Sequence, residues 1–568
     1  MSDGVKYSRL FEPFSLGRLA LKNRIVMPAM AVAFANEEGH VTQRLRDYFA
    51  ARARGGVGFI IVGLASVDFR RGRTGPNKLA IDDDKYLPGL KQLVETIHQE
   101  GIETAVQLHH GGGIAQSSLT GVRPVSPSPV LCRAGGDLPH PLTVGEIGEI
   151  VQSFAAAAER AVKAGFDGVE IHAAGPYLIN QFLSPARNKR QDGYGGGLRN
   201  RARFLLEVVG AIRQRLGPDY PLWARINGSE YGIAGGITLD DATGLAGMLE
   251  EAGCDAIHVS QFGIKYSFAE TEEPDGSFIH LAAAVKKAVS VPVIASGRIT
   301  PEVGERALRE EKADLVAIGR ALMADPELPL KAAAEREEDI NPCITCRYCG
   351  WLTPHGETGC TVNPALGKEG EFSLRRTEKM KRVLVIGGGP AGMEAARVAA
   401  LRGHDVTLME GGNRLGGQLH LASRVPHYRR IKEFALYLAR QVEKSGVKVE
   451  CGRRVTVAIL EAEKPDAVVL AAGSKLTLIR RLIAMGIVLL ARLGYPEIQD
   501  KGLLVKSLSR RRQIMGVQTP LLAASRSNQE LLSILRDRMP EVYLAGDCLE
   551  PAGIMQAMAD GARIGHSL

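Results

Sequence analysis

The sequence lacks several features that mark special classes of protein. Its 8 cysteines in 568 residues are too few for a fold built on disulfides. The longest strongly apolar stretch, residues 482–491, is about half of the roughly 20 residues that a membrane span needs. The N-terminus also lacks the basic and then apolar pattern of a signal peptide. These absences predict a soluble cytoplasmic protein with no membrane partner.

Net charge is also low, because Lys and Arg (71) exceed Asp and Glu (63) by only 8, scattered along the chain. So small and dispersed a surplus argues against a nucleic-acid partner and for solvated surface with sites for anionic cofactors. Hydrophobic residues make up 45% and charged residues 24%, which excludes wholesale disorder. The 65 glycines show no triplet period and gather in short clusters, which indicates backbone packed against ligands. The length predicts about three domains.

Short apolar runs alternate with longer helical patterns in the first part of the chain. The runs are 24–30, 58–63, 104–108, 168–172, 221–226, 256–260, 291–295 and 315–318. Each is typical of a parallel strand buried on both faces, and segments such as 87–100, 147–164 and 201–216 between them are helical. An open doubly wound sheet is the alternative, but eight strand–helix units favour a closed (β/α)8 TIM barrel over residues 1–335. The fold class is therefore α/β.

Polar residues and glycines follow these runs, at the end of a barrel where active sites form. Gln107 ends the third run, and its amide suits a ring edge of alternating N and C=O groups. Arg225 ends the fifth and suits negative charge that develops on such a ring when it is reduced. Arginine and glycine together after the last two runs suit a phosphate. Each residue alone fits a surface or loop position, but their joint placement predicts one site. The glycine–arginine pairs after the seventh and eighth runs are Gly297 with Arg298 and Gly319 with Arg320.

Residues 10–328 resemble the flavin-dependent old yellow enzyme family. The motifs that carry the resemblance are 39–42 (GHVT), 107–112 (QLHHGG), 177–185 (YLINQFLSP), 192–196 (DGYGG), 200–204 and 319–326 (GRALMADP). The resemblance implies FMN, with backbone of the strand-one end beneath its ring. The matching positions are Pro28, Ala29, Met30, Gln107, Arg225, Gly297, Arg298, Gly319 and Arg320.

Four cysteines crowd into residues 336–370, directly after the predicted barrel. Cys343, Cys346, Cys349 and Cys360 form a C-x2-C-x2-C-x10-C pattern. Four closely spaced thiolates suit a 4Fe-4S cluster, and structural zinc is the competing interpretation. Three cysteines at consecutive short gaps are less natural for zinc. The pattern also resembles the iron–sulfur branch of the family, with 2,4-dienoyl-CoA reductase, enoate reductases and trimethylamine dehydrogenase.

Residues 371–568 begin with a basic linker and then show a dinucleotide fingerprint. An apolar strand (382–386) precedes a G-x-G-x-x-G loop, a helix and a second strand ending at an acid about 20 residues further on. Residues 415–418 and 542–548 resemble FAD-contacting segments of disulfide-reductase-like flavoproteins, so FAD is preferred to NAD here. The predicted binding residues are Gly387, Gly389, Ala391, Gly392, Glu410, Gly417, Gln418, Gly546 and Asp547.

The same region departs from the family, whose members insert a second glycine-rich fold for NAD(P)H. No second G-x-G-x-x-G occurs here, and about a hundred residues are absent by comparison with the family. What remains is too short for a complete nucleotide-binding βαβ unit, which takes about 30 residues or more plus its loop. We therefore expect a truncated Rossmann-like FAD/NAD(P)-type domain in which hydride entry from NAD(P)H is lost or rerouted.

Three residues are candidates for catalysis. Tyr177 matches the proton-donor tyrosine of 2,4-dienoyl-CoA reductase, although packing under its loop is the alternative. His172 matches the first histidine of the pair that grips the substrate carbonyl in the family, but Gly175 stands where its partner would be. The dienoyl-CoA enzymes also lack that pair and use a histidine after strand six. Lys265 is the nearest equivalent here, either polarising a thioester oxygen or lying in a solvated loop.

The leading hypothesis is an FMN-dependent ene-reductase that acts on a conjugated C=C of an enoyl- or dienoyl-CoA or a related carbonyl compound. Electrons would pass through 4Fe-4S and FAD. One alternative is an amine dehydrogenase like trimethylamine dehydrogenase that passes electrons to an electron-transfer flavoprotein. The other is a non-catalytic electron-transfer subunit with a tight protein partner. Homo-oligomers, frequent in the family, are compatible with the sequence.

Overall fold

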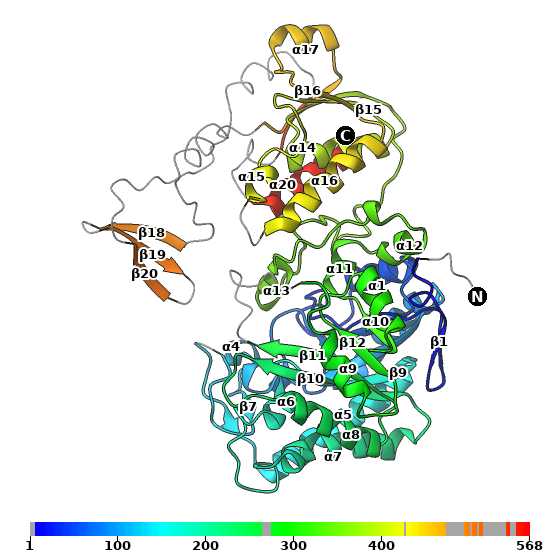
Figure 1. Ribbon diagram of the computed structural model, residues 1–568, viewed down its shortest axis with the longest axis vertical. Coiled ribbons are helices and arrows are strands. Elements are labelled where there is room, and N and C mark those ends of the chain that lie inside the picture. The colour runs from blue at the N-terminus through cyan, green and yellow to red at the C-terminus, as the bar shows by residue number, and fades with distance from the viewer. Residues whose placement is uncertain are drawn as a thin grey trace. The chain divides into compact units, whose positions relative to one another are not determined.

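The structure is a computed structural model, and it describes two compact units. The described residues are 6–133, 135–263, 274–424, 428–472, 494–499, 502–507, 510–514, 541–545 and 553–568. One unit is Met1–Ser373 with Pro426–Arg430, and the other is Leu374–Val425 with Ile431–Leu568 (Figure 1). The first contains the predicted barrel together with the cysteine segment, and the second contains the predicted dinucleotide fold.

Eight parallel strands close into a barrel in the first unit. They are β3 (Ile25–Met27), β4 (Phe59–Ser66), β6 (Glu103–His109), β9 (Gly168–Ala173), β10 (Leu222–Tyr231), β11 (Ala256–Gly263), β12 (Val293–Ser296) and β13 (Leu315–Ala317). Each pairs with the next in chain order, and β3 pairs with both β13 and β4, which closes the ring. The closed barrel confirms the predicted fold class, and every strand overlaps one predicted run. The main difference is β10, which continues past residue 226 through an irregularity between Asn227 and Glu230.

Helices follow the strands and surround the barrel (Figure 1). The longer ones are α1 (Gln43–Arg54), α3 (Leu87–His98), α5 (Val144–Ala164), α7 (Leu198–Leu216), α8 (Leu239–Glu251), α9 (Ile279–Lys286) and α10 (Pro301–Arg309). Their ends are set by local chemistry. In α5, Thr143 and Glu146 form a reciprocal capping box, and Gly165 ends the helix in a left-handed conformation.

Apolar side chains fill the interior of the barrel. Trp223, Phe59, Ala105 and Ile294 belong to one fully buried cluster. A short antiparallel hairpin, β1 (Phe14–Leu16) with β2 (Leu19–Leu21), adds its leucines to the same cluster. The interior of the barrel below the carboxyl ends of its strands is thus a packed apolar core, so polar chemistry is confined to those carboxyl ends.

The cysteine segment packs on the barrel and belongs to the same unit. It contains η3 (Glu337–Asp339), α13 (Tyr348–Leu352) and η4 (Thr353–His355). The Oγ1 atom of Thr358 accepts a hydrogen bond of 3.0 Å from the backbone of Ala33, in the loop after β3. Arg52 of α1 pairs with Glu369 at 2.5 Å, and the Arg52 side chain is fully buried. The sequence predicted a segment at 336–370, and these contacts fix it to the barrel.

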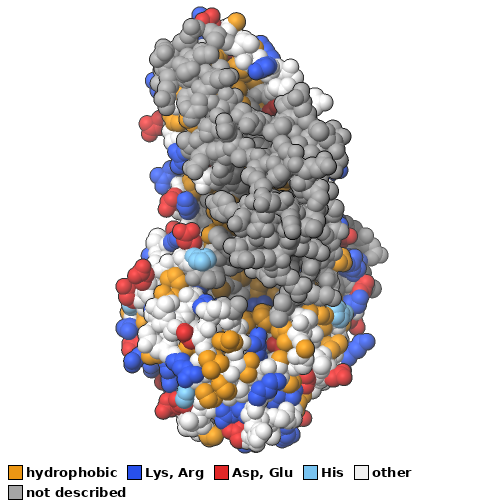
Figure 2. Space-filling view, turned by 90° about the vertical axis from the view of Figure 1, so that its left-hand side faces the viewer, with side chains coloured by type: hydrophobic (Ala, Val, Ile, Leu, Met, Phe, Trp, Pro, Cys, Tyr) orange, Lys and Arg blue, Asp and Glu red, His pale blue; other side chains and the backbone are white. Residues whose placement is uncertain are grey.

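Smaller elements complete the described part of the first unit. They are α2 (Phe69–Gly72), β5 (Leu79–Ala80), η1 (Asp84–Tyr86), η2 (Gly112–Ile114), α4 (Ser117–Thr120), β7 (Val125–Ser126), β8 (His140–Pro141), α6 (Leu178–Leu183), α11 (Arg320–Ala324) and α12 (Leu328–Ala333). Figure 2 shows basic, acidic and hydrophobic side chains interspersed on the visible face of the barrel.

The second unit contains a five-stranded parallel sheet in the order β16-β15-β14-β17-β21. The strands are β14 (Arg382–Ile386), β15 (Asp405–Glu410), β16 (Lys448–Cys451), β17 (Ala467–Leu470) and β21 (Val542–Leu544), and the helices are α14 (Pro390–Leu401), α15 (Leu419–Ala422), α16 (Arg429–Lys444), α17 (Val457–Glu463) and α20 (Ile554–Ser567). A separate antiparallel sheet comprises β18 (Gly494–Gln499), β19 (Gly502–Ser507) and β20 (Arg510–Ile514). Among the helices of the described residues, none is both long and apolar enough to cross a membrane.

Candidate active site

Three aromatic rings meet at the carboxyl end of the barrel. His109 ends β6, His172 lies near the end of β9, and Tyr177 stands just before α6. The ring centroid of His109 lies 4.3 Å from that of Tyr177, in an edge-to-face arrangement, and 5.5 Å from that of His172. The rings of His172 and Tyr177 are 4.7 Å apart. The structure therefore brings the two predicted catalytic residues Tyr177 and His172 together and adds a third ring.

Burial sets the protonation state of this cluster. Burial and the nearby charges of His110 and Lys78 lower the pKa of His109 well below its ordinary value. Burial and the charges of neighbouring His109 and Arg225 do the same to the pKa of His172. Burial raises the pKa of Tyr177, and Arg225 opposes that rise only in part. At neutral pH the site therefore presents two neutral imidazoles and a protonated phenol.

Arg225 lies near the rings of His172 and Tyr177, and Gln107 stands two positions before His109 on β6. The Nε2 atom of Gln107 donates to Glu170 at 2.5 Å, which turns the other amide atom, Oε1, away from the carboxylate. The Nη1 atom of Arg225 donates to the carbonyl oxygen of Ala29 at 3.3 Å. A Cβ atom added to Gly63 would be 3.0 Å from the Cβ of Gln107 and 3.4 Å from the Cβ of Ala29. Arg225 thus contacts the 28–30 segment, and Gln107 and Ala29 both lie against Gly63.

These residues fit the FMN that the sequence predicts. Gln107 Oε1 and Arg225 Nε are buried and have no hydrogen-bond partner among the described residues, so a ligand with complementary groups would satisfy them. Gly319 lies against this site, because a Cβ on it would come within 3.4 Å of Pro28 and 3.2 Å of Met30. The loops that begin with Gly297 and Gly319 follow β12 and β13, which are paired neighbours. Arg298 and Arg320 therefore come from adjacent strand ends, as a shared phosphate site requires.

The four cysteines lie close enough to affect one another electrostatically. Burial raises the pKa of the Cys349 thiol to about 11, with further contributions from Cys343 and Cys346. Burial, together with the other three thiols, raises the pKa of Cys360 as well. The charge of Arg320 lowers the pKa of Cys349, and this influence places the cysteine loop near the predicted FMN phosphate residues.

The donor set of this loop fits a thiolate-bound cluster chemically, because all four side chains are cysteines and partly buried. In the described part of the chain, no three His, Cys, Asp or Glu side chains converge closely enough to hold a metal ion. The 4Fe-4S cluster therefore stays a prediction that rests on the cysteine pattern.

The predicted dinucleotide loop lies between β14 and α14. Gly387, Gly389, Ala391 and Gly392 all fall in this turn or in the first turn of the helix. A Cβ on Gly392 would come within 1.9 Å of the Gly387 carbonyl oxygen, so only glycine lets the helix start so close to the strand.

Glu410 ends β15 beside this loop. Its carboxylate accepts hydrogen bonds from the backbone N–H groups of Gly388 at 2.6 Å and Gly412 at 2.7 Å. The segment with Gly417 and Gln418 also reaches the loop, because the backbone of Gly416 donates to the Gly388 carbonyl at 2.8 Å. The arrangement supports the predicted dinucleotide site.

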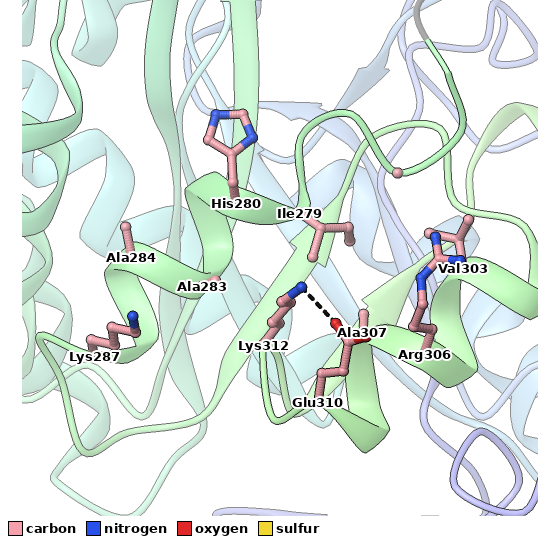
Figure 3. A pocket seen from close by; sticks show the side chains of 11 residues that line it. Ile279, His280, Ala283, Ala284, Lys287, Val303, Arg306, Ala307, Glu310 and Lys312 are labelled. Atoms are coloured by element: carbon pink, nitrogen blue, oxygen red, sulfur yellow. Dashed lines mark ion pairs between the residues drawn. The ribbon is translucent and has the colours of Figure 1, made fainter.

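Some predicted residues cannot be placed in this way. Lys265, Gly546 and Asp547 lie outside the described residues. A hollow of about 450 Å³ between α9 and α10 contains none of the predicted site residues (Figure 3). Its exposed lining includes His280, Lys287 and an ion pair between Lys312 and Glu310 at 2.5 Å. It lies between two outer helices of the barrel.

Comparison with known proteins identifies the family. Residues 9–339 match the model of the NADH:flavin oxidoreductase / NADH oxidase family. The chain belongs to that family. Residues 381–523 match the pyridine nucleotide-disulphide oxidoreductase model. The protein is therefore an FMN-dependent oxidoreductase with a second domain of the FAD/NAD(P)-binding type, as the sequence predicted.

Individual relatives are similar over most of the chain. An NADH oxidase of Thermoanaerobacter brockii is 44% identical over 479 residues, which cover 83% of this chain and 73% of the relative. A cinnamate reductase of Clostridium sporogenes is 35% identical over 440 residues, covering 73% and 66%. A solved complex of 2-naphthoyl-CoA reductase with 2-naphthoyl-CoA has a TM-score of 0.88 and 28% identity, and the match covers 99% of this chain and 100% of that one.

Two buried residues of the site, Glu170 and His258, were missed by sequence reasoning. Both point into the barrel, and the carboxylate of Glu170 joins Gln107, Trp223 and His258. The available signal was their spacing, because Glu170 stands two positions before His172 on β9 and so lies on the same inward face. Polar residues inside an otherwise apolar run indicate such a network only after the strands are known to close.

Proposed function

We propose that this family member reduces the conjugated C=C bond of an α,β-unsaturated acyl compound, such as an enoyl or dienoyl thioester of CoA. The observation that carries the proposal is the position of the Tyr177 phenol, 4.7 Å between ring centroids from His172 and within the electrostatic reach of Arg225. The similarity to a cinnamate reductase and to a structure with a bound aryl-CoA thioester supports the substrate class.

The residues of the site supply what this reduction needs besides electrons. FMN, when bound, provides a hydride equivalent for the β carbon and exchanges electrons singly or in pairs. A neutral imidazole of His172 donates a hydrogen bond to the carbonyl oxygen, which stabilises the negative charge that develops there. Tyr177, kept protonated by burial, donates the proton that the α carbon takes. The product gains one hydride and one proton, and Tyr177 recovers its proton from solvent.

Arg225 has a separate role in this proposal. Its guanidinium is buried, and burial lowers its pKa while Glu170 raises it, so it stays cationic. A fixed cation beside Gln107 favours negative charge on the reduced ring. Gln107 presents an amide oxygen without a partner to the same place. Together these residues hold and orient the cofactor.

Electron supply is the second part of the proposal. We propose a 4Fe-4S cluster on Cys343, Cys346, Cys349 and Cys360, and FAD on the loop of the second unit. The proximity of Arg320 to Cys349 supports passage of electrons between the cluster and the FMN site. The original donor is NAD(P)H through a rerouted entry or a redox partner protein, since the second glycine-rich motif is absent. Lys265 stays a proposed ligand of the thioester oxygen.

One anaerobic experiment tests the reaction. Protein loaded with FMN, FAD, iron and sulfide is photoreduced with a sacrificial electron donor and mixed with cinnamoyl-CoA, a dienoyl-CoA, free cinnamate or a cyclic enone. We expect flavin reoxidation with the thioesters, and an at least hundredfold slower reaction in Tyr177→Phe because general acid catalysis contributes about 10²–10⁴-fold. Absence of reoxidation with every acceptor would refute the substrate class. Bleaching of the oxidised flavin by secondary or tertiary amines would favour an amine dehydrogenase instead.

The cofactor content is measured on the same preparation. We expect one FMN, one FAD, four iron and four sulfide per chain, and titration with NADH and NADPH shows whether either reduces the flavins. Intact chromophores without any turnover, together with a co-purifying partner, would indicate the electron-transfer subunit.

A further inference from the structure

His109 is a buried side chain at the end of β6. It is 2% exposed, and neither ring nitrogen has a hydrogen-bond partner among the described residues. Buried polar atoms are almost always paired, so such an unpaired group needs an explanation. Its neighbour His110 differs, because the Nδ1 atom of His110 accepts a hydrogen bond of 3.1 Å from the backbone of Gly112. Only Nε2 of His110 has no partner among the described residues, whereas both nitrogens of His109 have none, so His109 has the greater unmet capacity to bind a ligand.

His172 is a second imidazole that can share a ligand with His109. The two residues come from β6 and β9, which are adjacent strands of the barrel. A hydrogen-bonded oxygen lies roughly 4 Å from the centroid of an imidazole ring. Since the two ring centroids are 5.5 Å apart, one oxygen can reach both rings at normal hydrogen-bond distance. Tyr177 lies against both rings, so an oxygen held there stays next to the phenol.

The protonation of His172 is compatible with this arrangement. The backbone N–H of Ala174 points to Nδ1 of His172 at 3.4 Å, which makes Nδ1 the acceptor and leaves the proton on Nε2. The pKa values of both histidines are lowered well below normal by burial, so each ring carries one N–H. Two neutral donors hold a carbonyl oxygen that becomes negative without the cost of burying two cations.

Position 175 has no side chain that could donate a second hydrogen bond to the carbonyl oxygen, and the close packing around Gly175 explains why. A Cβ on Gly175 would lie 3.1 Å from the ring of Tyr177 and 4.0 Å from that of His172. Its φ of +64° also disfavours residues with a side chain. A donor side chain at 175 would therefore have to displace Tyr177.

We propose that His109 is a substrate-binding catalytic residue that, together with His172, holds the carbonyl oxygen of the substrate. An imidazole from β6 thus takes the place of the donor that position 175 lacks. The inference rests on the proposed reduction of a conjugated carbonyl, because it assigns the contacts of that carbonyl oxygen. The alternative is that His109 only fills space between two other rings.

Binding of an oxyanion tests the proposal without any turnover. FMN-loaded protein is titrated with pentafluorophenolate, whose charged oxygen imitates the developing enolate, and binding is followed by calorimetry and by flavin absorbance. Pentafluorobenzene, which lacks the oxygen, measures the apolar part of the affinity. The variants are His109→Leu, which removes both nitrogens, and His109→Asn, which keeps a donor. His280→Leu makes the same change at an exposed histidine of α9 and is the matched control (Figure 3).

We expect His109→Leu to weaken phenolate binding at least tenfold, as loss of a hydrogen bond to a charged group does, and to leave pentafluorobenzene binding unchanged. His109→Asn should recover part of the affinity, and His280→Leu should match the wild type. Thermal unfolding of His109→Leu should not occur at a lower temperature, because no internal hydrogen bond is lost.

Two results would overturn the proposal: wild-type protein that does not bind the phenolate, or equal binding by His109→Leu. Failure of the proposed function gives a different pattern. In that case phenolate binding still depends on His109, while no enoyl acceptor reoxidises the flavin.

Discussion

Oε2 of Glu170 lies 2.6 Å from Nδ1 of His258, and both side chains are fully buried inside the barrel. The same oxygen accepts a 2.7 Å hydrogen bond from the indole of Trp223, and Oε1 accepts from Gln107. Burial alone would raise the pKa of Glu170, but His258, Arg225 and Trp223 outweigh burial and hold it below its ordinary value. Burial lowers the pKa of His258. The pair is therefore a carboxylate with a neutral imidazole, and the carboxylate balances the charge of Arg225.

This carboxylate orients the amide of Gln107, so its removal should weaken cofactor binding. We expect Glu170→Leu to lower FMN affinity at least tenfold, because Gln107 Nε2 loses a charged acceptor and the amide is free to rotate. Quenching of free FMN fluorescence measures the affinity. Glu170→Gln, which keeps an acceptor oxygen, should lie between Leu and wild type. Glu103→Gln, at the other end of β6, is the control, and equal affinities for all variants would exclude the orienting role.

The barrel could be predicted from the sequence because each strand contains a short run of mostly apolar, buried residues. β4 is buried at every position, and each predicted run overlaps a strand. The end of β10 could not be predicted in this way, because Glu230 is polar yet buried. Its carboxylate accepts hydrogen bonds from the side chains of Asn180 and Ser184 and from the backbone N–H of Ile237. Asn180 and Ser184 come from a segment that is distant in the sequence. The β1–β2 hairpin was missed because three-residue strands carry too little periodicity.

The candidate site also contains some residues that could be recognised from the sequence and others that only the folded structure reveals. Gln107, Arg225 and Tyr177 could be chosen as candidates from the sequence because they stand at or after the ends of the apolar runs and match family motifs, although Gln107 and Arg225 lie inside β6 and β10. The role of His109 could not, because its importance comes from the distance to His172 on another strand. Glu170 and His258 are separated by 88 positions, and only the closed barrel brings them together.

The ion pair of Arg52 with Glu369 should anchor the cysteine segment to the barrel. Arg52 is fully buried, lies over the ring of Tyr48 at 4.0 Å and donates to Glu369 at 2.5 Å. Glu369→Gln leaves a buried cation without its partner, so we expect the free energy of unfolding to fall by about 3 kcal/mol. Urea unfolding followed by tryptophan fluorescence measures it.

An exposed pair of the same type is the control for this change. Arg54 and Glu100 lie 3.0 Å apart, with the Arg54 side chain 57% exposed. Glu100→Gln should change the free energy of unfolding by less than about 1 kcal/mol. The double variant Arg52→Met with Glu369→Leu should be more stable than Glu369→Gln, since no charge is left buried. Equal effects of Glu369→Gln and Glu100→Gln would show that Glu369 is not an anchor.

Lys78 should make the stability of the barrel depend on pH. Its side chain is 5% exposed, and Nζ lies 3.5 Å from the carbonyl oxygens of Ala31 and Val32. Burial lowers its pKa from 10.5 to about 7. Between these values the unfolded chain binds more protons than the folded one, so the free energy of unfolding rises with pH over that range. Below about pH 7 the full cost of burying the charge is present.

Lys78→Met should remove this dependence and stabilise FMN-free protein at pH 7, by up to about 4 kcal/mol. Unfolding by urea at several pH values between 6 and 10 measures the slope. Lys91→Met, the same change at an exposed position of α3, should keep the wild-type slope. A wild-type slope in Lys78→Met would mean that the lysine is not held neutral by burial.

Two glycines of the dinucleotide loop should respond differently to the same change. A Cβ on Gly392 would lie 1.9 Å from the Gly387 carbonyl oxygen, whereas a Cβ on Gly389 would meet no atom of the described residues within 4 Å. Gly392→Ala should therefore lower the thermal stability of the second unit whether or not nucleotide is present. Gly389→Ala should leave stability unchanged and weaken FAD binding, because its new methyl group occupies the space where backbone approaches a pyrophosphate.

Differential scanning calorimetry and titration with FAD separate these two effects. Gly411→Ala, just after Glu410 and also without close neighbours, is the matched control and should alter neither quantity. If Gly389→Ala binds FAD as tightly as the control does, the pyrophosphate does not lie over this loop. The predicted use of the fingerprint at 387–392 would then be wrong, while the packing argument for Gly392 would stand, because it depends on the protein's own atoms.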